Sequence, residues 1–401
     1  WRCVIYAPAA NGPLKSIRGD SLNTVLSSTE KRVARANILT SSYDAGAALG
    51  LITNPFFEIS QENGTTAGAA ASSYFAADQW YAIESSDAVL SVQNVVDPFS
   101  STATLKRLKN SIKATATTAD GTIAAGQFIL PCVQAIEGTF WKSLGWGTAD
   151  ARDINIAIIA QCSVTGTYPV AIRNGAFNRA YVATVSLTAN TPTLCFLTIP
   201  GDTSGTWVST TAEGASICIG GVAGSTYQSS AVNAWEAGNF LSHSTCTNWA
   251  ASGTTNFFQL GYAQIFPAGV LPFASASEIT GEALQLLLNM RRSYDVEAQR
   301  CDRYWQKSYS YSTAPATVTD DGSVLWIAAG TNSYHQFFVP LNVTMRTACT
   351  VVMYSPATGA VDKIRNINTA TDIAAFPQRL GEKSFMGTVN TVSVTDAYLS
   401  F

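Results

Sequence analysis

A chain of 401 residues is long enough for two or three domains. Only 13% of its residues are charged, while 47% are hydrophobic and 10% are aromatic, which excludes a disordered chain and favours half-buried strands over long surface helices. The net charge of −3 gives no electrostatic footprint for nucleic-acid binding, and no apolar run is long enough to span a bilayer, so we expect neither nucleic acid nor membrane insertion.

The N-terminal segment, residues 1–50, is predicted to be an attachment or linker segment. It contains turn-forming residues at 7–13 and a short amphipathic stretch that opens with a capping box at Ser27–Glu30. The tripeptide Arg18-Gly19-Asp20 is known from cell adhesion, but three residues recur by chance. The chain begins at Trp1 rather than at a methionine, so we expect residues to precede it in the full protein.

Residues 51–310 are predicted to form a jelly-roll β-sandwich. Runs such as Asp153–Ile158, Ala180–Leu187 and Ser216–Ile219 have the composition or alternation of strands, and glycine-bearing turns separate them. Many short strands without interleaved helices favour an antiparallel sandwich. One helix is predicted near residues 278–292, because strong helix formers follow an early acidic residue, and a second helical turn is predicted at Asp295–Arg303.

Residues 311–401 are predicted to form a small C-terminal β domain. Its expected strands are Ser323–Ile327, His335–Pro340 and Cys349–Tyr354. The whole chain is therefore predicted to be mainly β.

The residues that carry chemistry are sparse. The eight cysteines are widely separated, with no Cys-x-x-Cys pair, which disfavours a zinc site; they are either buried thiols or disulfides. His243 lies in a hydroxyl-rich loop without a nucleophile elbow, and His335 lies at a strand start. We expect no catalytic residues, no metal and no cofactor.

An ordered series of short motifs extends from about residue 51 to about residue 355. The series is Asn54–Gly64, Asp78–Tyr81, Gln134–Gly138, Trp146–Ala149, Arg173–Arg179, Ile199–Trp207, Gly224–Gln228, Trp235–Phe240, Cys301–Lys307 and Met345–Val351. In this order the motifs resemble a module widespread in bacteriophage tail-fibre and related virion proteins. The resemblance implies a jelly roll like those of carbohydrate-binding modules and a role in virion structure, often in host attachment. The helix at Ala283–Arg292 departs from the family pattern.

These observations predict a structural virion component of fibre or spike type, exposed on the particle surface and not an enzyme. We expect other virion proteins as partners, a homotrimer, and a host-surface glycan as a ligand. The alternatives are a capsid-decorating protein that binds only virion proteins and, less favoured, a glycan depolymerase, which would need two acids held across a sugar.

Sugar binding needs an exposed aromatic ring and a few polar partners. Trp249, Trp235, Tyr227 and Asn256 fall in or near polar loops and are the predicted carbohydrate contacts. The alternative is that these aromatics pack the core or a subunit interface, most clearly for Trp235, which belongs to the shared motifs.

Overall fold

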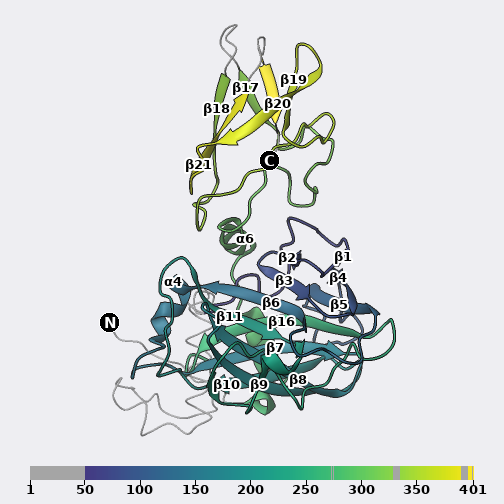
Figure 1. Cartoon of the computed structure of the whole chain (residues 1–401), viewed down its shortest axis with the longest axis vertical. Coiled ribbons are helices and arrows are strands. Elements are labelled where there is room, and N and C mark those ends of the chain that lie inside the picture. Colours follow the sequence, from purple (N-terminus) through teal and green to yellow (C-terminus); the bar gives the residue numbers. More distant parts are fainter. Residues whose placement is uncertain (1–49, 272, 274, 328–334, 390–395, 400) are drawn as a thin grey trace, which may run out of the picture.

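The protein is a β-sandwich with a smaller β unit at its C-terminal end (Figure 1). The structure is a computed structural model that describes residues 50–271, 273, 275–327, 335–389, 396–399 and 401. The predicted linker, its amphipathic stretch and the Arg18-Gly19-Asp20 tripeptide lie outside the described residues, apart from Gly50.

Two antiparallel sheets face each other across the core of the sandwich, as predicted for a jelly roll. The first sheet is ordered β1 (Gly68–Ala69), β4 (Val89–Val96), β5 (Asn110–Thr118), β16 (Phe257–Pro267), β7 (Ile154–Cys162) and β10 (Thr193–Ile199). The second is ordered β14 (Trp235–Ala237), β9 (Arg179–Leu187), β8 (Gly166–Asn174), β11 (Glu213–Ile219), β6 (Phe128–Glu137), β3 (Trp80–Glu84) and β2 (Tyr74–Ala77). The short strand β12 (Val222–Ala223) adds to this sheet by pairing with β6, whereas β13 (Gln228–Ser229) and β15 (Ser242–His243) form a separate two-stranded parallel sheet.

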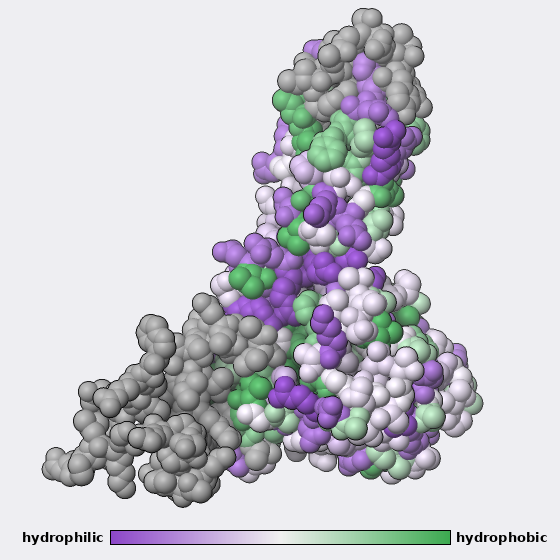
Figure 2. Space-filling view, turned by 90° about the vertical axis from the view of Figure 1, so that its left-hand side faces the viewer, coloured by the Kyte–Doolittle hydropathy of each residue, from purple (hydrophilic) through white to green (hydrophobic). Residues whose placement is uncertain are grey.

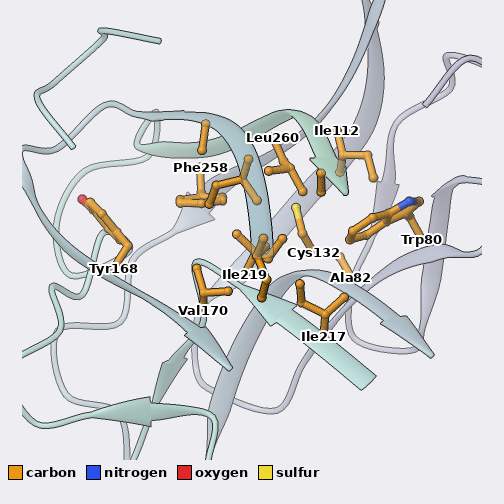
Figure 3. Packing of buried hydrophobic residues seen from close by; sticks show 14 of the residues in the cluster. Trp80, Ala82, Ile112, Cys132, Tyr168, Val170, Ile217, Ile219, Phe258 and Leu260 are labelled. Carbon is orange, nitrogen blue, oxygen red and sulfur yellow. The ribbon is translucent and has the colours of Figure 1, made fainter. Parts of the chain in front are cut away.

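The inward side chains of the two sheets interdigitate in one apolar core (Figure 3). Ile217 and Ile219 of β11 meet Phe258 and Leu260 of β16, and all four are less than 2% exposed. This burial is the main favourable term in the stability of such a sandwich.

A β-bulge in β16 shifts the alternation of its side chains between the two cores on either side of the first sheet. The register with β7 shifts between Leu260 and Tyr262, which inverts the side-chain alternation beyond Gly261. Leu260 and Ala263 therefore both face the sandwich core, whereas Tyr262 faces the opposite side. A Cβ on Gly261 would lie 2.2 Å from the Phe99 ring, so only glycine fits there.

The outer face of the first sheet is covered by helix α5 (Glu282–Asn289). Leu284, Leu287 and Leu288 of this helix pack with Ala157 and Ile159 of β7. The predicted helix near residues 278–292 is thus confirmed. The polar–apolar alternation at Asp153–Ile158 predicts burial of one face of this strand, but α5 buries the second face of β7 as well.

The second predicted helical turn is α6 (Tyr294–Asp302), which lies between the sandwich and the C-terminal unit (Figure 1). The short helix α4 (Gly138–Trp141) follows β6 at one end of the sandwich.

The C-terminal unit is a six-stranded antiparallel sheet around a small core. Its order is β17 (Val324–Ile327), β22 (Asp396–Leu399), β19 (Lys363–Asn366), β20 (Thr371–Gln378), β21 (Ser384–Val389) and β18 (His335–Pro340). The predicted strands at 323–327 and 335–340 are confirmed. The strand expected at Cys349–Tyr354 is wrong: this stretch, like the preceding Met345–Val351 motif, is irregular, with one isolated bridge between Tyr354 and Val361, because it runs along the junction with the sandwich instead of pairing in the sheet.

Candidate functional site

A cavity of about 660 Å³ lies where the C-terminal segments cross the outer face of the second sheet. Hydrophilic residues gather at this junction, as Figure 2 shows for one face of the molecule. The floor comes from the sandwich and the roof comes from the segment after α6 and from residues 341–354. Floor residues are Glu62, Phe75, Asp78, Gln79, Tyr81, Ala135, Ile136, Glu137 and Glu213; among the roof residues are Arg303, Tyr304, Trp305, Gln306, Lys307, Met345 and Arg346.

The roof is attached to the floor by an ion pair between Arg303 and Glu137. Arg303 donates from Nε and Nη2 to the two oxygens of Glu137, at 2.9 and 3.0 Å, and the Tyr304 hydroxyl donates to Oε2 at 3.2 Å. The Thr139 hydroxyl donates to the other oxygen. Glu137 ends β6, and its side chain is only 1% exposed, so its charge depends on these donors.

The same donors set the protonation of Glu137. Burial raises the pKa of this carboxyl, but the hydrogen bonds and charge of Arg303, with the two hydroxyls, outweigh burial and hold the pKa below its ordinary value. Glu137 is therefore a structural carboxylate.

A second attachment is made by Lys307. Its ammonium donates to the backbone oxygens of Gln61, Tyr311 and Thr313 at 2.5, 2.9 and 2.7 Å, which joins the floor to the segment after α6. Burial lowers the pKa of Lys307 to about 8, although the charge of Asp78 opposes this change. Asp78 itself accepts hydrogen bonds from the backbone and side chain of Gln61 at 2.8 and 2.7 Å.

Aromatic rings line the cavity from both sides. The rings of Phe75 and Tyr81 lie 5.5 Å apart on the floor, both half-buried, and the half-buried Trp305 lies in the roof. Burial raises the pKa of Tyr81 to about 12, so its hydroxyl stays protonated and can donate a hydrogen bond.

Two acids and one arginine complete the polar lining. The pKa of Glu62 is raised by burial and by the charge of Asp78, and the pKa of Glu213 is raised by burial, which Arg173 and Arg346 partly offset. Arg346 donates from Nη1 to the backbone oxygen of Thr211 at 3.1 Å, which holds its guanidinium at the rim.

The predicted carbohydrate contacts are not brought together. Trp249 is fully buried and donates to the Gly220 oxygen at 3.1 Å, so the prediction that its ring is open to a ligand is wrong. Asn256 lies in a loop beside Ser163 and Ser252. Tyr227 packs edge-on against Phe128, with ring centres 5.5 Å apart.

Trp235 belongs to an aromatic cluster at one end of the sandwich. Its ring centre lies 5.0 Å from that of Trp146, 5.1 Å from that of Tyr181 and 5.6 Å from that of Trp207, and its Nε1 donates to the Pro200 oxygen at 2.9 Å. The contacts favour the packing alternative for Trp235.

An ion pair supports this cluster. Arg179 donates from Nε and Nη2 to Asp202 at 3.0 and 2.7 Å, and Trp207 donates to Asp202 Oδ2 at 3.0 Å. Several motifs of the virion-protein resemblance thus supply buried structural contacts.

The residues that line the cavity were missed because they come from distant parts of the sequence. Tyr81, Glu137 and Trp305 do lie inside the quoted motifs, which was the available signal, but the motifs do not say which face of a strand each residue occupies.

Among the described residues, the seven cysteines are all unpaired thiols, so the disulfide alternative finds no support there; Cys3 is not described. No group of three or more His, Cys, Asp or Glu side chains in the described ranges is placed to hold a metal ion. None of the described helices is long and apolar enough to cross a membrane.

No family model and no curated protein matches the chain. Among solved structures, the chain is similar to the CBM22-1–GH10 modules of the Clostridium thermocellum endo-1,4-β-D-xylanase 10B complexed with xylohexaose, with a TM-score of 0.28 and 10% identity over 57% of this chain and 30% of that chain. It is also similar to a CBM4 structure, with a TM-score of 0.26 and 15% identity over 54% of this chain and 99% of that chain. A third similar structure is the enzymatically active domain of bacteriophage CBA120 tailspike protein 4, with a TM-score of 0.27 and 11% identity over 55% of this chain and 21% of that chain. TM-scores this low do not support a conclusion about function.

Proposed function

We propose that this chain is a structural component of a bacteriophage virion, of fibre or spike type, and that its junction cavity binds a glycan of the host surface. The observation that carries the glycan-binding part is the cavity itself. Its volume suits a short oligosaccharide, and aromatic rings face polar groups inside it.

The aromatic and the polar residues of the lining each supply a kind of contact that sugar binding requires. Pyranose rings stack on aromatic faces, which Tyr81, Phe75 and Trp305 supply from the floor and the roof. Sugar hydroxyls need donors and acceptors at the same time, which Gln79 and Glu213 supply. The two attachments described above hold these groups in place, so little order has to be gained on binding.

We propose binding without cleavage. Glycosidic hydrolysis needs two carboxyl groups across the sugar, one of them free to donate a proton and one free to act as base or nucleophile. Glu137 and Glu213 are direct register partners on β6 and β11, but both oxygens of Glu137 are engaged by Arg303 and its neighbours. Asp78 is likewise held through both oxygens by Gln61, which leaves Glu62 and Glu213 as the two acids whose activity a hydrolysis assay has to test.

Binding can be tested with polysaccharide purified from the host surface and the full-length protein. Trp305→Ala and Tyr81→Ala are expected to weaken binding about tenfold, because each removes a stacking face. Phe338→Ala is the matched control, since Phe338 is 62% exposed on β18, in the other β unit, and does not line the cavity. Unchanged binding in both cavity variants would contradict the proposal, and release of reducing ends by the wild type would identify a depolymerase instead.

The virion role has its own test. Microscopy of labelled particles is expected to place the chain in a fibre or spike, and light scattering is expected to give a trimer; a stable monomer would contradict the trimer.

One observation favours the capsid-decorating alternative. Phe338 and Phe376 are 62% and 47% exposed on strands that flank β21, which gives the C-terminal unit an apolar face suited to another virion protein. Capsid localisation together with absent glycan binding would support this alternative.

A further inference from the structure

More acidic than basic side chains line the junction cavity. Its lining includes four acids and three bases; the acids are Glu62, Asp78, Glu137 and Glu213, and the bases are Arg303, Lys307 and Arg346. Two of the bases are committed to structure, because Arg303 pairs with Glu137 and Lys307 is surrounded by backbone oxygens beside Asp78.

This commitment leaves two carboxylates without a direct cation. Within the described residues, neither Glu62 nor Glu213 takes part in an ion pair, and the nearby Arg346 donates to the Thr211 backbone. Both carboxylates line the same cavity as the aromatic rings of Tyr81 and Trp305.

Aromatic faces and carboxylates that line one cavity can together bind an organic cation. A ring attracts a cation over its face, and an acid adds a charge-assisted hydrogen bond to an ammonium. Trp305 already accepts one such contact, because the Lys307 ammonium lies 5.8 Å from its ring centre.

On these grounds, and resting on the proposed glycan-binding function, we infer that the cavity selects a glycan that carries a protonated amino sugar over neutral and acidic glycans. The ammonium would lie between the rings and the carboxylates of Glu62 and Glu213. An acidic sugar would bring a further negative charge beside Glu62 and Glu213, which is unfavourable.

The pKa shifts of Glu62 and Glu213 make this selection dependent on pH. Burial raises the pKa of both carboxyls, and the charge of Asp78 adds to this effect for Glu62. A bound ammonium would lower both pKa values, so the preference for the amine should weaken as the pH falls and these carboxyls gain protons.

The test uses the full-length protein and three probes: an oligomer of glucosamine, its fully N-acetylated counterpart, and an oligosaccharide of uronic acid. The first two share one backbone and differ in N-acetylation, which removes the charge of the amine. The glucosamine oligomer is expected to bind about tenfold more tightly than the N-acetylated one at neutral pH and low salt, and the uronic acid probe most weakly.

Variants then locate the effect. Glu62→Gln combined with Glu213→Gln should bring the ratio of the two affinities close to one, whereas Glu282→Gln should leave it unchanged, because Glu282 is exposed on α5, on the opposite sheet. Equal or tighter binding of the N-acetylated oligomer, preference for the uronic acid, or binding of none of the three probes would overturn the inference. If the host polysaccharide still bound, and Trp305→Ala still weakened that binding, the inference about the amino sugar would fail while the proposed glycan-binding function held.

Discussion

Arg303 and Glu137 are 166 residues apart in sequence and form a two-bond ion pair in the fold. Glu137 is the last residue of β6 and Arg303 directly follows α6, so the pair joins the second sheet of the sandwich to the segment that leads into the C-terminal unit. The floor of the cavity and its roof are therefore held in register by side chains that do not have to contact the ligand.

Loss of this pair should destabilise the protein. Arg303→Ala leaves the buried Glu137 carboxylate without its cation, and we expect the free energy of unfolding to fall by about 2–4 kcal/mol. Urea denaturation measures this change. Arg303→Lys should lose less, because one charge and one hydrogen bond remain. A midpoint of unfolding that is unchanged in Arg303→Ala would show that the pair contributes nothing to stability.

The same pair should make stability depend on acid pH. The folded pKa of Glu137 lies below its ordinary value of 4.5, so its contribution to stability is complete above that value and is lost as the pH falls through the folded pKa. Glu62 and Glu213 shift in the opposite direction, so the contribution of Glu137 is isolated by comparing wild type with Glu137→Gln. The difference in unfolding free energy between the two proteins should shrink between about pH 6 and pH 3. A constant difference would count against the assignment.

Trp249 and Trp305 should separate stability from binding. Trp249 is fully buried between the sheets, so Trp249→Ala should reduce the free energy of unfolding by about 3–5 kcal/mol, as measured by denaturant titration. Trp305→Ala should weaken glycan binding with a smaller loss of stability, because its ring is only partly buried. If Trp249→Ala left the free energy of unfolding unchanged, Trp249 would again be a candidate for contact with a ligand at the surface.

Helix α5 should stabilise the outer face of the first sheet. Leu287 is fully buried against β7 and β16 residues, and Leu287→Ala should destabilise the protein by about 2–5 kcal/mol in the same titration. Leu286→Ala, on the same helix with a half-buried side chain, is the matched control and should lose less. Equal losses would mean that the helix does not pack as described.

The thiols should react in an order set by burial. Burial raises the pKa of Cys132 and Cys301 well above its ordinary value, and both side chains are inaccessible. In a Cys3→Ser background, the half-buried Cys246 and Cys349 should be alkylated first in the native protein, followed by the others only on unfolding. Mass spectrometry of labelled peptides measures this order, and early labelling of Cys132 would contradict it.

The sequence predicted the architecture well and the site poorly. Runs such as Ala180–Leu187 form strands as their period-two pattern predicts, although both faces of this strand are largely buried. Burial of the second face of β7 was not predicted, because the helix that covers it lies more than a hundred residues further along the chain. A local hydrophobic pattern contains no information about contacts between residues so far apart in the sequence.

The candidate site depends on the same kind of distant contact. Trp249 was favoured because polar residues surround it in sequence, yet its ring turns into the core and only the neighbouring loop is polar. Tyr81, Glu213 and Trp305 meet only when β3, β11 and the segment after α6 come together. That meeting is set by sheet order and by the Glu137–Arg303 pair, and neither can be derived from spacing along the chain.

The proposed function requires a sugar to bind in the cavity between the second sheet and the segment after α6. The most direct measurement is a crystal structure of the full-length protein with a bound fragment of the host-surface polysaccharide. We predict that the sugar lies in the junction cavity and contacts Tyr81 and Trp305. A sugar bound elsewhere on the molecule, with the junction cavity left open, would show that the cavity is not the binding site.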